Sequence, residues 1–245
     1  MSGETDKLLR YIERGGNLLW LLDTGALHGL ERLAEILDLV LPPGTVIDPA
    51  AAAMNAPATW SLGASYPPHA ITRNFNLITV FPFSRPLIWN ENPPDANQSP
   101  ASDNSKDWQR HVLVEVAARG WVSRKMPKGK PAFDKQHDIP GPAVIAIALQ
   151  RNLHDREQRI VVVGNGAFLA NSFAGNGGNV DLGVNMMNWL IGEEHLITLQ
   201  PRAAKDSNLT LGKTPLYVIS FGSLLVLPLL LAGVGGLIWW KRRRA

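Results

Sequence analysis

The residues best suited to hold a ligand lie in a turn near residue 164. The segment VVVGNGAFLANSFAGNGGN spans 161–179, where Gly164, Asn165 and Gly166 follow an apolar run. A strand that leads through such a turn into a helix is where α/β folds bind ligands, and a helix N-terminus favours anions. Leu169 stands where a dinucleotide-binding motif needs its third glycine, and no P-loop lysine follows. The turn therefore predicts either a tight strand-to-helix connection or a ligand site of another kind.

The residues that most often perform catalysis are dispersed along the chain. No two of the six histidines show a compact metal-binding spacing, and the G-x-S-x-G motif of an α/β-hydrolase is missing. The sequence has no cysteine, which excludes disulfides, thiolate metal sites and cysteine nucleophiles. A hydrolase that uses the 164–171 turn is an alternative, although the sequence reveals no nucleophile and base for it. We expect no enzymatic activity, no cofactor and no metal.

The elements that must position this turn alternate between helix and strand. The pattern predicts three helices: one over 4–14, one that begins after a cap at Asp23 and Thr24, and one over 180–194. It predicts strands over 17–23, 45–49, 111–117, 141–151, 158–171 and 195–202. The runs 141–151 and 158–171 are almost continuously apolar, which suits parallel strands covered on both faces. We therefore expect an α/β domain with a largely parallel sheet over 1–202. Such a domain normally starts with a strand, so we expect its first strand, and with it a first membrane span, to precede residue 1.

The last long segment of the chain is uniformly apolar. Residues 215–240 contain no charged side chain, and a helix of about 20 residues crosses a bilayer core. Tyr217 near one end and Trp239 with Trp240 at the other fit the aromatic belts of membrane interfaces. A buried core helix is the alternative, but core helices are rarely so long or so apolar. We predict a transmembrane helix over 215–240, joined to the domain by a polar linker over 203–214.

Charge indicates how such a helix would be oriented. The net charge of +3 comes from the tail 241–245, because without its four basic residues the chain has 20 basic and 21 acidic residues. No basic face remains for nucleic acid, so we expect no nucleic-acid partner. The positive-inside rule places the tail in the cytoplasm and the domain outside it. The polar N-terminus, which does not resemble a signal peptide, favours instead a tail-anchored protein with a cytoplasmic domain.

Five segments and their order resemble the gliding-motility-type ABC-transporter auxiliary proteins. They are LLRYIERGGNLLWLLD at 8–23, SYPPHAIT at 65–72, GPAVIAIAL at 141–149, RIVVVGNGAFLAN at 159–171 and GNVDLGVNMMNWLIGEEHLITLQPR at 178–202, before the apolar span and KRRR. The resemblance covers nearly the whole chain. It implies an extracytoplasmic, or periplasmic, three-layer domain of the flavodoxin-like or glutamine-amidotransferase-like type, anchored in the bacterial cytoplasmic membrane. It also implies a non-catalytic accessory subunit whose partners are a permease and an ATPase. Membrane lipid is the partner expected of the apolar span, and whether the chain also forms a homo-oligomer is left open by the sequence.

The resemblance also singles out site residues. The positions that match the family pattern most closely are Gly164, Asn165, Phe168, Asn171, Asn179, Asn185, Asn188 and Trp189. It implies that they shape the fold and a ligand or partner surface. The amidotransferase nucleophile is a cysteine, so no catalytic role is carried over to this chain. The alternatives are an envelope module that binds or senses a small molecule, with Asn165 and Asn171 converging on its pocket, and a hydrolase using the 164–171 turn.

Overall fold

The computed structural model describes residues 2–89, 108–124, 131–153, 156–198 and 221–244. The chain divides into two compact units, Met1–Gln200 and Pro201–Ala245. The expected linker over 203–214 lies outside the described residues, as do the first six residues of the expected span, 215–220, and the end of the strand expected over 195–202.

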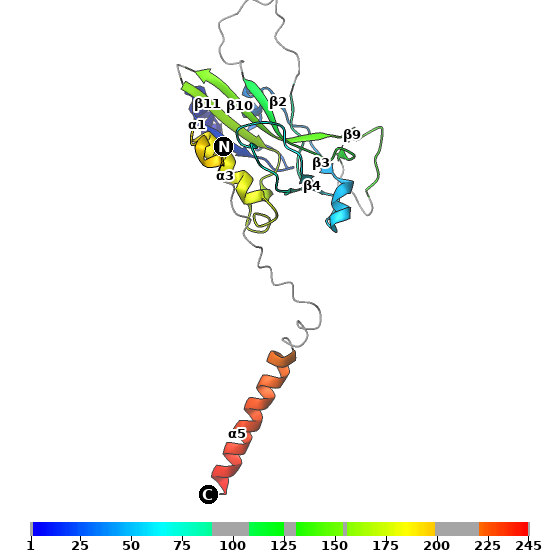
Figure 1. Cartoon of the computed structure of the whole chain (residues 1–245), viewed down its shortest axis with the longest axis vertical. Coiled ribbons are helices and arrows are strands. Elements are labelled where there is room, and N and C mark those ends of the chain that lie inside the picture. Colours follow the sequence, from blue (N-terminus) through cyan, green and yellow to red (C-terminus); the bar gives the residue numbers. More distant parts are fainter. Residues whose placement is uncertain (1, 90–107, 125–130, 154–155, 199–220, 245) are drawn as a thin grey trace, which may run out of the picture. The chain divides into compact units, whose positions relative to one another are not determined.

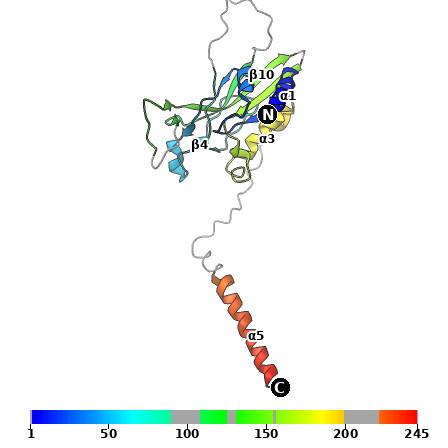
Figure 2. The same ribbon diagram turned by 180° about the vertical axis from the view of Figure 1, so that it is seen from behind.

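The first unit is built on a four-stranded sheet with the strand order β1-β11-β10-β7. Of these strands, β10 and β11 are labelled in Figure 1, and Figure 2 shows β10 from behind. The strands are β1 (Leu18–Leu21), β7 (Gln109–Val116), β10 (Ala143–Leu153) and β11 (Arg156–Val163). β1 and β11 are parallel, whereas β10 pairs antiparallel with both of its neighbours. The expectation of a largely parallel, flavodoxin-like sheet is therefore wrong. Only residues 154 and 155 separate β10 from β11, and parallel neighbours would need a crossover of a dozen residues or more.

Three smaller antiparallel sheets surround the central one, with pairings β2-β6, β3-β8-β9 and β4-β5. Their strands are β2 (Leu39–Val40), β3 (Thr45–Ile47), β4 (Trp60–Gly63), β5 (Thr79–Pro82), β6 (Ile88–Trp89), β8 (Trp121–Ser123) and β9 (Ile139–Pro140). The α-helices are α1 (Ser2–Glu13), α2 (Glu31–Ile36) and α3 (Asn179–Leu190), and the 3-10 helices are η1 (Pro49–Met54), η2 (Ala167–Leu169) and η3 (Glu194–Thr198).

Two expected elements differ from those observed. The helix expected after the Asp23 cap begins only at Glu31, because the Asp23 carboxylate accepts from the adjacent Thr24 N–H and His28 has a left-handed backbone with φ of 51°. Left-handed backbone interrupts a right-handed helix. The strand expected from 195 onward is the 3-10 helix η3 as far as Thr198.

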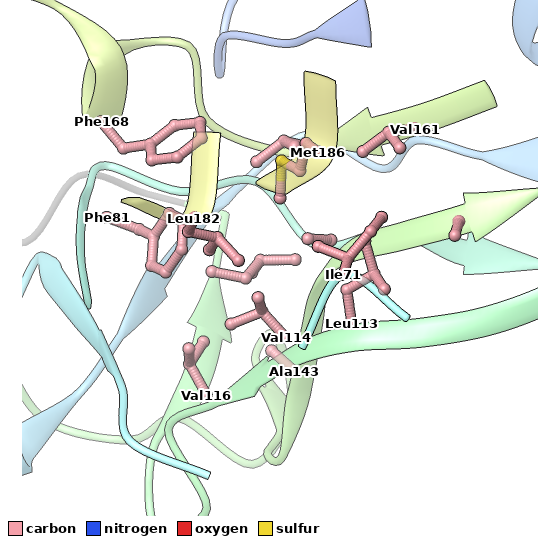
Figure 3. Packing of buried hydrophobic residues seen from close by; sticks show 14 of the residues in the cluster. Ile71, Phe81, Leu113, Val114, Val116, Ala143, Val161, Phe168, Leu182 and Met186 are labelled. Atoms are coloured by element: carbon pink, nitrogen blue, oxygen red, sulfur yellow. The ribbon is translucent and has the colours of Figure 1, made fainter. Parts of the chain in front are cut away.

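The hydrophobic core lies on both faces of the central sheet. In β11, Ile160 and Val162 join the cluster that α1 and α2 cover, whereas Val161 and Val163 join the cluster under α3. Alternate strand residues point to opposite faces, so a continuously apolar strand fills two core layers. Figure 3 shows the second layer, where Leu182 and Met186 of α3 lie among aromatic and branched side chains.

The second unit contains a π-helical turn, η4 (Gly222–Val226), and the helix α5 (Leu227–Arg243). Within the part of the chain that is described, one helical stretch, Leu224–Arg243, is long and apolar enough to cross a membrane, with a mean hydropathy of 1.8 over its most apolar window. The apolar C-terminal helix expected from the sequence is therefore present.

Candidate functional site

The glycine turn follows β11 and lies beside the end of β1, as expected for the carboxyl ends of two parallel strands. Gly164 donates its N–H to Ile145 O at 2.7 Å, and its carbonyl accepts from Arg85 N at 2.6 Å. A Cβ at Gly164 would lie 2.0 Å from Arg85 O, so only glycine allows this approach. The turn is thus packed against the backbone of Arg85.

Arg85 joins this turn to the loop that follows β1. Its side chain is 4% exposed, and Nη2 donates to Thr24 O at 3.0 Å and to Gly25 O at 2.6 Å. Burial lowers the pKa of Arg85, and the nearby Asp23 carboxylate opposes that effect. Sequence reasoning did not single out Arg85, and its place after a Pro- and Phe-rich stretch offered no signal of burial.

Asn165 and Phe168 stabilise the turn itself. Asn165 is buried; its Nδ2 donates to Pro82 O, and its Oδ1 accepts from Phe168 N at 2.7 Å, at the first turn of η2. The Phe168 ring is fully buried, 5.1 Å from the ring of Phe81 (Figure 3). Asn171, by contrast, is exposed. The amide of Asn165 is therefore engaged with backbone inside the turn, whereas Asn171 faces solvent.

The asparagines of α3 also bond to backbone. Asn179 is fully buried; its Nδ2 donates to Val80 O at 2.9 Å and to Phe168 O at 3.1 Å, and its Oδ1 accepts from Val80 N at 2.8 Å. Asn185 donates from Nδ2 to Ile71 O at 3.1 Å. Asn188 is half-buried on the same helix. These amides satisfy backbone groups that would be costly to bury alone, and they tie α3 to the segment 71–82.

Trp189 belongs to an aromatic and cationic cluster at the end of α3. The Trp189 ring is buried 5.1 Å from the ring of His69, which lies 5.3 Å from the ring of His111. Arg159 lies over the Trp189 ring at 5.0 Å and donates to Trp189 O at 2.7 Å. Burial, followed by the charges of His111, Arg159 and Arg73, lowers the pKa of His69 to about 4. His69 is therefore neutral in the folded domain at neutral pH.

A large hollow on the described surface has no residue of the predicted turn in its lining. It is a groove of about 980 Å³ between the η1 segment, the loop after β4 and the end of β7. Its walls are mainly proline, alanine and larger apolar side chains, with charges at Asp48, Glu115 and Arg119. Met54 and Ile78 are its exposed large apolar residues. A sizeable apolar concavity with few polar groups is the usual form of a binding site.

Hydrogen bonds make the walls of this groove rigid. The Tyr66 hydroxyl lies 2.7 Å from Gly63 O and Leu77 O and 2.9 Å from Thr79 Oγ1, and burial raises the pKa of Tyr66. The Asp48 carboxylate accepts from Ala50 N at 3.0 Å and from Leu62 N at 3.1 Å. Sequence reasoning missed the groove, although SYPPHAIT at 65–72 holds its Tyr-Pro-Pro wall and could have indicated a fixed loop.

Catalytic arrangements are not evident in the described ranges. His69 Nδ1 accepts from Ile71 N at 3.2 Å, so this nitrogen faces backbone and not a serine or aspartate. The pair His137–Asp134, at 2.8 Å, lies in an exposed loop. Among the residues that the structure describes, no group of three His, Cys, Asp or Glu side chains could hold a metal ion.

Comparison with known proteins identifies a fold but no family. No family model matches the sequence, and no curated protein matches it. The structure is similar to a solved structure described as the mmIFT52 N-terminal domain, with a TM-score of 0.50 and 13% sequence identity, covering 78% of this chain and 71% of that chain. At this identity the likeness concerns the fold alone. The first unit is a mixed α/β domain with small, mostly antiparallel sheets, and not the flavodoxin-like domain expected from the sequence.

Proposed function

We propose that this chain is a non-catalytic, membrane-anchored accessory subunit of an ABC-type transport system. The observation that carries the membrane anchoring in this proposal is the apolar helix Leu224–Arg243. Leu224, Leu231 and Leu237 are each about two-thirds exposed or more. Such a continuous apolar surface is rare on soluble proteins and suits the hydrocarbon core of a bilayer.

The end of this helix supports an orientation in the membrane. Arg243 lies over the Trp239 ring at 5.0 Å, and Arg244 lies over the Trp240 ring at 4.2 Å. Tryptophan rings and arginines together favour the interface between hydrocarbon and water. By the positive-inside rule, this end lies at the cytoplasmic face and the first unit lies outside the bacterial cytoplasmic membrane.

The interior of the first unit supports a binding role without catalysis. The amides of Asn165, Asn179 and Asn185 are engaged with backbone groups, and this leaves them without reach to a substrate. The groove instead offers apolar side chains, Met54 and Ile78 among them, on rigid walls. It suits a short apolar segment of a partner, either the permease or the transported material. The assignment to ABC transport rests on the sequence resemblance.

Anchoring is tested on the full-length chain expressed in bacteria. We expect the chain to float with membranes and to resist alkaline carbonate, because the apolar helix needs lipid around it. A phosphatase reporter that is active only in the periplasm, fused after Ala245, should be silent, whereas a cytoplasmic fluorescent reporter at the same position should glow. A chain that stays in the aqueous phase without detergent refutes the anchor, and the opposite reporter pattern refutes the orientation.

The groove is tested by charge substitution. We expect Met54→Glu to abolish co-purification of a permease and an ATPase with the tagged chain, because an apolar partner segment would bury the carboxylate. Val40→Glu is the matched control, since Val40 is 47% exposed on β2 and does not line the groove. If wild-type chain captures no transporter subunit after cross-linking in membranes, the transport assignment is wrong.

The groove also favours a second candidate, an envelope module that binds a small molecule. Its volume of about 980 Å³ lies at the upper end of the range for small-molecule sites. In this case a ligand should raise the thermal unfolding midpoint of the wild-type chain and of Val40→Glu, but not that of Met54→Glu. Two results together would favour ligand binding as the function of the groove. Wild type and Met54→Glu would capture transporter subunits equally, and a ligand would stabilise wild type but not Met54→Glu.

A further inference from the structure

Arg85 is a buried cation whose charge has no acidic partner. The residue is 4% exposed, and its side chain bonds from Nη2 to the carbonyls of Thr24 and Gly25. Its Nε and Nη1 atoms are closed off from solvent and, within the described residues, have no hydrogen-bond acceptor. Arginine is almost never fully buried without a partner, because a charge that leaves water must be compensated. The folded domain therefore holds a positive charge that an anion would neutralise.

Arg110 shows how this chain compensates a largely covered arginine. Its side chain is 17% exposed, and Nη2 pairs with a carboxylate oxygen of Asp38 at 2.9 Å. The Nε atom of Arg110 also lacks an acceptor, but the carboxylate already balances the charge. Arg85 has no such ion pair among the described residues; burial lowers its pKa, and only the more distant charge of Asp23 opposes that effect. What Arg85 lacks is therefore an anion, and not merely one hydrogen bond.

Arg85 lies where two parallel strands end. Its backbone N–H donates to Gly164 O at 2.6 Å, just after β11, and its side chain reaches the carbonyls of Thr24 and Gly25 in the loop after β1. The crevice outside the carboxyl ends of parallel strands is where α/β folds bind ligands. A Cβ at Gly164 would lie 2.0 Å from Arg85 O, so close packing fixes the backbone of Arg85 before any ligand arrives.

The loop that covers Arg85 also borders a hollow. Asp23 and Ala26, on either side of the two bonded carbonyls, line a hollow of about 440 Å³ between α1 and the segment 20–30. Gly25 bonds to Arg85 and is itself exposed, so a single layer of backbone covers the guanidinium at this point. If the carbonyls of Thr24 and Gly25 turned outward, the donors of Arg85 would open toward the hollow.

The acids beside this hollow restrict the kind of anion. Asp23 is exposed, and Glu4 lines the same hollow. A carboxylate only accepts hydrogen bonds at neutral pH, whereas the Arg85 guanidinium only donates them. A ligand that bonds to both must therefore carry oxygens that accept and a hydroxyl group that donates. Phosphate has both at neutral pH, whereas sulfate is fully ionised and has no proton to donate.

We propose that Arg85 and Asp23 form a binding site for protonated phosphate, as the free ion or as a monoester, at the carboxyl ends of β1 and β11. Binding exchanges the carbonyls of Thr24 and Gly25 for phosphate oxygens, which accept charge-assisted bonds from the guanidinium, and a P–OH group donates to the Asp23 carboxylate. This site shares no lining residue with the groove and does not need the membrane anchor, so it goes beyond the function proposed above.

The test compares phosphate with sulfate on the full-length chain in a neutral detergent, at pH 7 and constant ionic strength, by isothermal titration calorimetry. We expect inorganic phosphate to bind at least about tenfold more tightly than sulfate, because sulfate has no proton for Asp23. Both ions also stabilise proteins by exclusion from their surface, so a difference between them reports a site. Tighter binding of glycerol phosphate than of inorganic phosphate identifies a monoester as the ligand, and the reverse order identifies the free ion.

Asp23→Asn tests the role of the carboxylate. Asparagine keeps an acceptor for the Thr24 N–H that Asp23 Oδ1 binds at 2.7 Å, and residue 23 is exposed, so the fold should be retained. The preference for phosphate over sulfate should disappear, because the asparagine amide can donate to either ion. A preference in Asp23→Asn as large as that of wild type overturns the inference.

Arg85→Lys tests the role of the guanidinium. Lysine keeps the charge but not the planar set of donors, so phosphate should bind at least about tenfold more weakly. Arg110→Lys is the matched control and should bind phosphate like wild type, because Asp38 already pairs the charge at that position. Circular dichroism verifies folding, and Asp23→Asn decides if Arg85→Lys does not fold. Wild type that binds neither ion or both equally, or folded Arg85→Lys that binds phosphate like wild type, overturns the inference and leaves the anchor and the groove untouched.

Discussion

Replacing His69 by asparagine should make the domain less sensitive to acid. His69 is partly buried between the rings of Trp189 and His111, and its Nδ1 accepts a hydrogen bond from Ile71 N. Asparagine can offer an acceptor near the same place and carries no charge at any pH. The substitution therefore removes a titratable group while it keeps the hydrogen bond.

The direction and the size of this effect follow from the lowered pKa of His69. The folded state holds this pKa at about 4, against 6.5 for an exposed histidine, first by burial and then by the charges of His111, Arg159 and Arg73. Between pH 6.5 and 4 the unfolded chain binds a proton that the folded chain excludes, so stability falls as the pH falls through this window. The difference corresponds to at most about 3.4 kcal/mol, and partial exposure of His69 reduces it to about 1–2 kcal/mol.

Urea unfolding of the full-length chain in detergent, at pH 7.5 and 4.5, measures this difference. Trp189 lies 5.1 Å from His69, so tryptophan fluorescence reports on the same region. We expect wild type to lose about 1–2 kcal/mol more than His69→Asn on acidification. His28→Asn is the control, because His28 is exposed and asparagine tolerates its φ of 51°. Equal losses in wild type and His69→Asn, or an NMR titration of His69 near pH 6.5, would refute the reasoning.

Three substitutions test how the turn, α3 and the end of α1 are held, each by the midpoint of denaturant unfolding. Asn179→Ala should cost about 3 kcal/mol, because it leaves the partly buried Val80 N–H and several carbonyls unpaired, whereas exposed Asn171→Ala should cost less than about 0.5 kcal/mol. Gly164→Ala should strongly destabilise the folded chain, since the added Cβ would lie 2.0 Å from Arg85 O. Gly166→Ala should have a mild effect on stability, because its Cβ would meet no atom closer than 3.5 Å. Gln158→Met should cost about 2 kcal/mol and loosen the end of α1, whose Ile12 O it binds at 2.8 Å.

The strands were the most predictable part of the fold. The predicted strands over 141–151 and 17–23 correspond to β10 and β1, but the strand predicted over 158–171 is β11 only as far as Val163, after which the turn and η2 follow. Whether these strands pair parallel or antiparallel could not be predicted from their apolar residues, because a strand buried on both faces has the same continuous apolar sequence in either kind of sheet. The short connection between β10 and β11 was the better signal, since a few residues can join antiparallel strands only.

The candidate site was less predictable. The sequence marked the asparagines at 165, 179 and 185 as candidates for a ligand or partner surface, whereas their amides bond to the backbone of segment 71–82, which is remote in sequence. The groove, whose lining runs from Asp48 to Pro142, and the contact between His69 and Trp189 arise from residues far apart in the sequence, which no local pattern encodes. The sequence predicted that the helix α3 is apolar on most sides, but only the structure separates its buried inner face from its exposed outer face.

The amides of α3 have a mechanical consequence. Asn179 holds both backbone groups of Val80, Asn185 holds Ile71 O, and Gly178 N, just before the helix, donates to Ile78 O at 2.8 Å. Ile78 is itself part of the groove wall. These hydrogen bonds join the helix α3 to this wall of the groove. A partner that bound the outer side of α3 and rotated the helix would therefore move this wall and change the width of the groove, without itself touching the groove.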